Sequence, residues 1–174
     1  MPSASRNQKR SDSFQQRPSG LLTKQTRQTI RMKITRFEDL KVWQLAHKLS
    51  IEIAELAKSF PRDEKYDLGG QMRRSARSIP SDISEGYGRF HFNDKLTFYE
   101  RARASLGELR NHFQEASGNK YIDEDCYKRF LKKVNEIGYL LSRMMKGVRT
   151  ARDLHENEKR LKRYSRRSLT SSSE

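Results

Sequence analysis

Glu108, His112 and Glu115 have the residue types and helical spacing that could hold a metal ion. His112 follows Glu108 by four residues and precedes Glu115 by three, so the three side chains would share one face of a helix. Di-iron centres in helical bundles need inward carboxylates from four helices and a Glu-x-x-His pair on two of them. The three-residue step at His112 runs in the reverse order, and no second site of this kind is evident. We therefore predict no metal site and no cofactor.

Cys126 is the single cysteine of the 174-residue chain, so neither an internal disulfide nor a cysteine metal cluster can form. It falls in the first turn of a predicted helix, where a thiolate is favoured, but a small residue at a helix start is the simpler interpretation. Neither a nucleophilic triad nor a glycine-rich phosphate loop is evident. We therefore expect a protein that is not an enzyme. A lone cysteine fits a reducing cytosol, and we predict a cytoplasmic protein. No apolar run approaches the roughly 18 residues of a membrane span, so we expect no segment to cross a membrane.

Clustered arginines and lysines are the residues that favour binding of a polyanion. Arg73 and Arg77 lie one helical turn apart with Arg74 between them, and an arginine can bind a phosphate through two hydrogen bonds. Such contacts position RNA or DNA without reading its sequence. For any single cation, a solvated helix face is the simpler interpretation. The predicted nucleic-acid-binding residues are Arg73, Arg74, Arg77, Arg103, Arg110, Lys128, Arg129, Lys132 and Lys133. The aromatic residues that could stack on bases are Trp43, Tyr66, Tyr87 and Phe90, although Trp43 also fits a core stripe.

The net charge of +15 is concentrated at the two ends of the chain. Residues 1–36 hold nine Lys and Arg against one acidic residue, and residues 151–174 hold seven against four. The middle, 37–150, is only mildly basic, with 21 against 17. Basic ends attract polyanions in a salt-sensitive way.

Residues 1–31 are rich in Ser, Gln, Arg and Thr and show no sustained periodicity, so we predict a disordered basic extension. Three interpretations stay open: an arm that grips RNA, a transit-like peptide, and a segment upstream of a true start at Met32.

Four segments carry apolar residues at alternating steps of three and four, which is typical of helices packed around a shared seam. The segments are 40–60, 64–87, 93–118 and 123–150, and their short connections favour antiparallel neighbours. We predict an all-α fold, an antiparallel up-down four-helix bundle over 32–150, with a frayed helix and basic tail over 151–174. The expected helix-boundary residues are Pro61, Asn93, Gly118 with Asn119, and Asp123. The expected apolar stripe of the fourth helix is Tyr127, Leu131, Val134, Ile137, Leu141, Met144 and Val148.

Pro80 interrupts the second helical pattern inside the segment Ser78–Arg89. Because proline lacks an N–H and crowds the carbonyl four residues back, we predict a kink near this position. Three serines of the segment, Ser78, Ser81 and Ser84, are expected to bond to nearby backbone.

Two other residue types in this segment have expected roles. Glu85 is expected to accept hydrogen bonds from the Arg73–Arg77 flank or from a neighbouring helix. Gly86 and Gly88 would let another backbone approach closely or would end the helix.

Five stretches together resemble one family: Arg36–Ala46, Phe60–Leu68, Gln71–Ser81, Glu85–Arg89 and Ser105–Leu109. The chain is similar to the small four-helix-bundle proteins encoded in intervening sequences of bacterial 23S ribosomal RNA. Relatives of that family include the accessory variability proteins of diversity-generating retroelements. Asp82 and Ser84 stand where the family usually has Asn and Ala, and an acid at 82 makes that turn less attractive to phosphate.

The resemblance implies self-association. It also implies binding to nucleic acid through a basic surface, because the accessory relatives form pentameric rings that bind a reverse transcriptase and nucleic acid. The expected partner is RNA or DNA, with ribosomal or another structured RNA favoured. The alternative is a structural or adaptor oligomer whose partner is a protein and whose charge serves only solubility.

Overall fold

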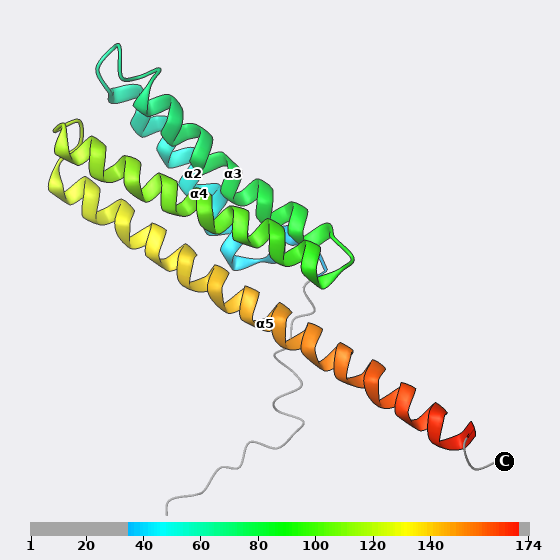
Figure 1. Ribbon diagram of the computed structural model, residues 1–174. Coiled ribbons are helices and arrows are strands. Elements are labelled where there is room, and N and C mark those ends of the chain that lie inside the picture. The colour runs from blue at the N-terminus through cyan, green and yellow to red at the C-terminus, as the bar shows by residue number, and fades with distance from the viewer. Residues whose placement is uncertain (1–34, 171–174) are drawn as a thin grey trace, which may run out of the picture. The chain divides into compact units, whose positions relative to one another are not determined.

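The computed structural model describes residues 35–170, with side chains as far as Tyr164, and this part of the chain is a bundle of four α-helices (Figure 1). The helices are α2 (Lys41–Leu56), α3 (Leu68–Gly88), α4 (Phe92–Gly118) and α5 (Glu124–Thr170). Two short 3-10 helices flank α2, namely η1 (Phe37–Asp39) and η2 (Ala57–Ser59). The predicted all-helical four-helix fold is confirmed. The extension predicted over residues 1–31 and the proposed start at Met32 both lie outside the described residues.

The four helices pack in a ring: α2 against α3, α3 against α4, α4 against α5, and α5 more sparsely against α2. Along α4 and α5 the contacts run in opposite order. Phe113 stacks on Phe130 near one end, with ring centroids 5.0 Å apart, and Glu100 pairs with Arg149 at 2.7 Å toward the other. These two helices are therefore antiparallel, and Figure 1 shows α3 and α4 also running in opposite directions.

The turn between α4 and α5 is fixed by backbone hydrogen bonds. The N–H of Tyr121 donates to the carbonyl of Ala116 at 2.8 Å, and that of Lys120 donates to Ser117 at 3.0 Å. These two bonds form a Schellman motif, in which Lys120 takes the left-handed position with φ of 59°. The stop predicted at Gly118 and Asn119 is thus confirmed within a residue or two.

One helix cap was predicted correctly and one was not. Asp123 accepts a hydrogen bond from the backbone N–H of Cys126 at 2.7 Å and so caps α5. Asn93 does not cap α4, because the helix begins at Phe92 with His91 in the cap position. The side chain of Asn93 instead accepts a hydrogen bond from Arg152 at 3.3 Å.

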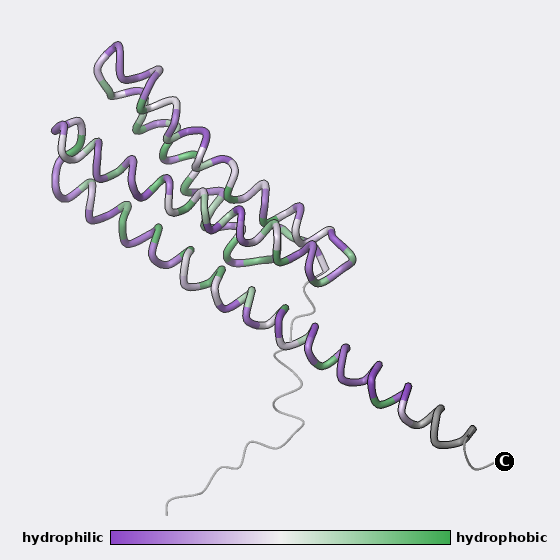
Figure 2. The backbone as a smooth tube through the Cα atoms, in the orientation of Figure 1, coloured by the Kyte–Doolittle hydropathy of each residue, from purple (hydrophilic) through white to green (hydrophobic). Residues whose placement is uncertain are grey.

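The core lies along the inner faces of the helices, and Figure 2 shows apolar and polar residues alternating along each of them. On α5, Val134, Ile137 and Leu141 are buried as predicted. Phe130 and Met145 are buried in place of the predicted Leu131 and Met144, which are half-buried. The core of α5 therefore lies slightly around the helix from the predicted stripe.

Pro80 lies inside α3, which continues to Gly88, and the kink predicted there stays a prediction. Gly86 is needed for the packing of α3 on α4. A Cβ at this position would come within 2.5 Å of Cε1 of Tyr99 and 3.1 Å of Cβ of Phe98. The close approach expected at Gly86 is therefore present, and it is made by α4 side chains rather than by backbone.

Helix α5 is longer than predicted and continues 20 residues past Thr150. Side chains from Asp153 to Tyr164 are exposed, because the apolar stripe fades where α5 leaves the other helices. Within the described residues, no helix combines the length and apolarity that crossing a membrane requires.

Candidate nucleic-acid interface

The three residues that could have held a metal ion lie near one another on α4. Glu108 Oε1 is 3.5 Å from His112 Nε2, and Glu115 Oε2 is 3.8 Å from Nδ1. The imidazole is mostly buried, and neither ring nitrogen has a hydrogen-bond partner in the described part of the chain. Among all the residues that the structure describes, no group of three or more His, Cys, Asp or Glu is arranged to hold a metal.

Four of the nine predicted cations are engaged within the bundle. Arg73 donates to the carbonyl of Lys65 at 3.1 Å, and so ties α3 to the loop before it. The other three form ion pairs: Arg103 with Glu100 at 2.6 Å, Lys128 with Glu124 at 3.3 Å, and Lys133 with Glu52 across the α2–α5 contact.

The remaining five predicted cations form no ion pair within the described residues. Arg74, Arg77, Arg110 and Lys132 are exposed, and each projects a charge that solvent or a polyanion can reach. Arg129 lies 5.3 Å from the ring of Phe130 and donates weakly to the sulfur of Cys126 at 3.6 Å. These five are the predicted residues that are available to contact phosphate.

Three of the predicted cations border one exposed face centred on α2. Ile51, which is 53% exposed, lies between two hollows. The hollow between α2 and α3, of about 370 Å³, is lined by Arg77. The hollow between α2 and α5, of about 480 Å³, is lined by Arg129 and Lys133. We call this surface, formed by Ile51, Arg77, Arg129 and Lys133, the α2 face.

Two carboxylates also line the hollows beside the α2 face, those of Glu52 and Glu55, and both are paired with lysines. Glu52 pairs with Lys133, and Glu55 pairs with Lys58 at 2.7 Å. Arg77 and Arg129 thus supply positive charge that no carboxylate among the described residues is paired with. Arg74, three residues before Arg77 on α3, is exposed but lines neither hollow. Arg103 and Arg110 belong to α4 and line neither hollow. The predicted set therefore does not form one surface.

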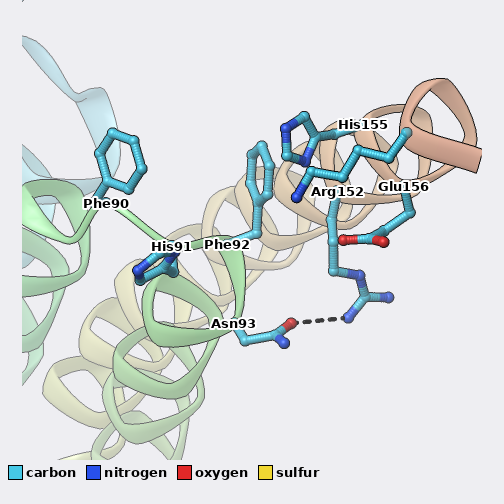
Figure 3. Close-up of a pocket in the computed structure, with 8 residues that line it drawn as sticks. Phe90, His91, Phe92, Asn93, Arg152, His155 and Glu156 are labelled. Carbon is cyan, nitrogen blue, oxygen red and sulfur yellow. Dashed lines mark hydrogen bonds between the residues drawn. The ribbon is translucent and has the colours of Figure 1, made fainter. Parts of the chain in front are cut away.

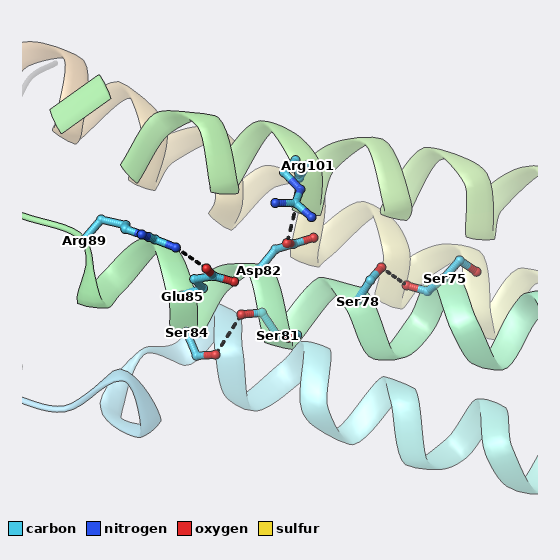
Figure 4. A network of polar contacts seen from close by, with 8 residues as sticks. All are labelled: Ser75, Ser78, Ser81, Asp82, Ser84, Glu85, Arg89 and Arg101. Atoms are coloured by element: carbon cyan, nitrogen blue, oxygen red, sulfur yellow. Dashed lines mark hydrogen bonds and ion pairs between the residues drawn. The ribbon is translucent and has the colours of Figure 1, made fainter. Parts of the chain in front are cut away.

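The segment Ser78–Arg89 forms a polar network on α3, most of it local (Figure 4). Ser78 donates to the carbonyl of Ser75 at 2.9 Å, and Ser84 donates to that of Ser81 at 2.8 Å, as predicted for both. The partner predicted for Glu85 is wrong. Its carboxylate pairs with Arg89, four residues on in the turn that follows α3, and not with the Arg73–Arg77 flank or a neighbouring helix.

Asp82 is the buried acid of this network. Its residue is 7% exposed, and its carboxylate lies 3.7 Å from the guanidinium of Arg101 on α4. Burial raises the pKa of the Asp82 carboxyl above its usual value, and the positive charge of Arg101 partly opposes that rise. Arg101 and Arg89 also lie over the ring of Phe98, at 5.0 and 4.5 Å from its centroid. The network therefore fastens α3 to α4 and makes a poor phosphate site.

A further concave site, which was not predicted from the sequence, lies where α4 begins (Figure 3). It has a volume of about 380 Å³ and is called here the end pocket. Its lining residues are Phe90, His91, Phe92, Asn93, Arg152, His155, Glu156 and Lys159. Half of this lining comes from the part of α5 beyond Thr150, where a frayed helix and basic tail were predicted. The composition of residues 151–164 could have predicted a regular helix there, because this stretch contains neither Gly nor Pro and is rich in good helix formers.

Fold and site together define a four-helix-bundle protein with an exposed cationic face. Residues 38–143 match the family model of the 23S rRNA-intervening sequence protein, and the chain belongs to that family. The resemblance drawn from the sequence is therefore confirmed.

A solved structure with a similar fold is a protein of unknown function from the S23 ribosomal protein family of Bacteroides thetaiotaomicron. It is 21% identical, with a TM-score of 0.57, and the match covers 60% of this chain and 98% of that one. At this level of identity, the likeness shows the fold alone. No curated protein matches the chain.

Proposed function

We propose that this protein is a non-enzymatic oligomer that binds RNA or DNA through the cationic α2 face. Structured RNA, including ribosomal RNA, is the favoured ligand. The proposal places the protein in the cytoplasm. By analogy with the accessory relatives, we propose more specifically that the oligomer is a pentamer and that one of its partners is a reverse transcriptase.

One observation supports the proposal most strongly: cations of α3 and α5 lie together beside the exposed side of α2. Arg77 of α3 and Arg129 of α5 lie on either side of Ile51, and neither has a carboxylate partner within the described residues. Arginines without carboxylate partners keep their hydrogen-bond donors for phosphate oxygens. Two hollows beside them would admit the backbone of a nucleic acid from either side of α2.

The second candidate is an adaptor oligomer that binds another protein. The exposed Ile51 favours it, because an apolar side chain surrounded by charged residues is common in protein interfaces. The two candidates differ in their response to salt. Phosphate contacts release counterions, so nucleic-acid affinity falls steeply as salt rises.

The test is a titration of a structured RNA at two salt concentrations with the full chain and with a chain lacking residues 1–31. The second chain separates the bundle from the basic N-terminal segment. We expect both chains to bind at low salt and to lose affinity by tenfold or more at about 200 mM salt, as for several phosphate contacts. If the shortened chain does not bind RNA at low salt, the bundle is not the binding element and the adaptor candidate is favoured.

A further inference from the structure

Phe90 is the most exposed of the large apolar side chains in the described part of the chain. It is 90% exposed and lies in the turn 89–91 that joins α3 to α4. Its ring contacts the imidazole of His91 edge-on, with centroids 5.3 Å apart. A phenyl ring held in a short turn with almost all of its surface in water has a face free to stack on a flat ligand.

The end pocket places further rings and hydrogen-bonding groups beside Phe90. Phe92 is half-buried and meets His155 of α5 at a centroid distance of 5.7 Å (Figure 3). The amide oxygen of Asn93 accepts a hydrogen bond from Arg152 at 3.3 Å, which fixes α5 against the start of α4. The volume of about 380 Å³ lies within the range of small-ligand sites.

The charges around the end pocket suit one nucleotide rather than an apolar ligand. Lys159 lines the pocket and forms no ion pair within the described residues, so its ammonium can bind a phosphate. Glu156 supplies a carboxylate, which can accept a hydrogen bond from the amino group of a base. Arg152 is bonded to Asn93 and to Asp153, and it acts mainly to hold the pocket together.

We propose that the end pocket binds an unpaired base of single-stranded nucleic acid, with Phe90 as the stacking ring and Lys159 as the phosphate contact. The inference rests on the proposed function, and it adds a preference for single-stranded over duplex segments. Proteins recognise single strands by stacking unpaired bases on aromatic side chains, whereas in a duplex those faces are covered by neighbouring bases. A loop or end of a structured RNA would reach this pocket while its paired part contacts the α2 face.

The test compares Phe90→Ala with the wild-type full chain on a mixed-sequence single strand and on a blunt duplex of the same length. Loss of one stacked base should weaken single-strand binding roughly 5- to 150-fold, with duplex affinity and the salt dependence unchanged. Lys159→Gln should instead lower the slope of log affinity against log salt by about 0.7 for the single strand. Tyr139→Ala is the matched control, because Tyr139 is also an exposed aromatic residue (62%) but lies outside the end pocket. It should bind like the wild type.

Each other outcome contradicts the inference. If the wild type binds both nucleic acids and Phe90→Ala leaves both affinities unchanged, the end pocket is not used while the proposed function stands. An equal loss on duplex and single strand would also overturn it. A change of molar mass in light scattering with Phe90→Ala would assign the ring to contacts between copies instead. If the wild type binds neither nucleic acid at low salt, the proposed function fails as well.

Discussion

Replacing Gly86 by alanine tests the close packing of α3 on α4. In most exposed helical positions the change stabilises a protein, because alanine is the better helix former by about 1 kcal/mol. At Gly86 the new Cβ would lie 2.5 Å from Cε1 and 2.8 Å from Cδ1 of Tyr99, well inside van der Waals contact. Tyr99 is 3% exposed, so its ring has little room to move. The same burial raises the pKa of its phenol to about 12.

The size of the effect follows from two opposing contributions. Overpacking of a well-packed core costs about 1–3 kcal/mol, and the helix preference of alanine offsets about 1 kcal/mol of that. We therefore expect Gly86→Ala to lower the free energy of unfolding by up to about 2 kcal/mol. Gly107, on the exposed side of α4, is the control, because a Cβ there would meet nothing within 4 Å. Gly107→Ala should raise the free energy of unfolding by up to about 1 kcal/mol.

The assay is urea unfolding of both variants followed by far-ultraviolet circular dichroism at one fixed protein concentration, since an oligomer's stability depends on concentration. The difference between the two variants isolates the packing cost, which should be about 1–3 kcal/mol. Tyr99→Leu should reduce the cost of Gly86→Ala, a coupling that a double-mutant cycle measures. If Gly86→Ala stabilises the protein as much as Gly107→Ala does, the packing at Gly86 is not as described.

Three further substitutions have expected effects on stability. Because burial raises the pKa of Asp82 in the folded state, the wild type loses stability as pH rises from the ordinary carboxyl pKa through that raised value. The side chain of Asp82→Asn cannot ionise, so the free energy of unfolding of this variant relative to the wild type should increase as pH rises through that range. A difference in the free energy of unfolding that stays constant with pH would contradict this. Lys120→Gly should raise the free energy of unfolding by about 1 kcal/mol, because glycine takes the left-handed conformation without strain; an unchanged midpoint would refute it. Asp123→Ala removes the cap of α5 and should cost about 1 kcal/mol, whereas Asp123→Asn should cost much less.

The parts of the fold that follow local rules could be predicted from the sequence. The cap at Asp123 and the stop near Asn119 depend on hydrogen bonds between residues a few positions apart. Asn93 misled the prediction because a cap residue must stand just outside the helix, and α4 begins one residue earlier. The part of α5 beyond Thr150 was predicted only as a frayed helix, because the apolar stripe ends there, whereas a helix rich in charged residues can continue without one.

The arrangement of the candidate site depends on which helices are neighbours, and this cannot be read from spacing along the chain. Arg77 and Arg129 are 52 positions apart and come to the same face only because α2 lies between α3 and α5. The engagement of Lys133 by Glu52 has the same cause. By contrast, the pairs within one helix, such as Lys128 with Glu124, follow directly from a four-residue step.

The most direct test of nucleic-acid binding by the α2 face is a comparison of two charge reversals that change the net charge equally. Arg77→Glu with Arg129→Glu alters two cations of the α2 face, and Arg143→Glu with Lys146→Glu alters an exposed part of α5 outside both hollows. We expect the first pair to lower the slope of log RNA affinity against log salt by about 1.4–1.8, as for two lost phosphate contacts, and the second to leave the slope nearly unchanged. Equal slopes for the two variants would contradict a binding surface at the α2 face.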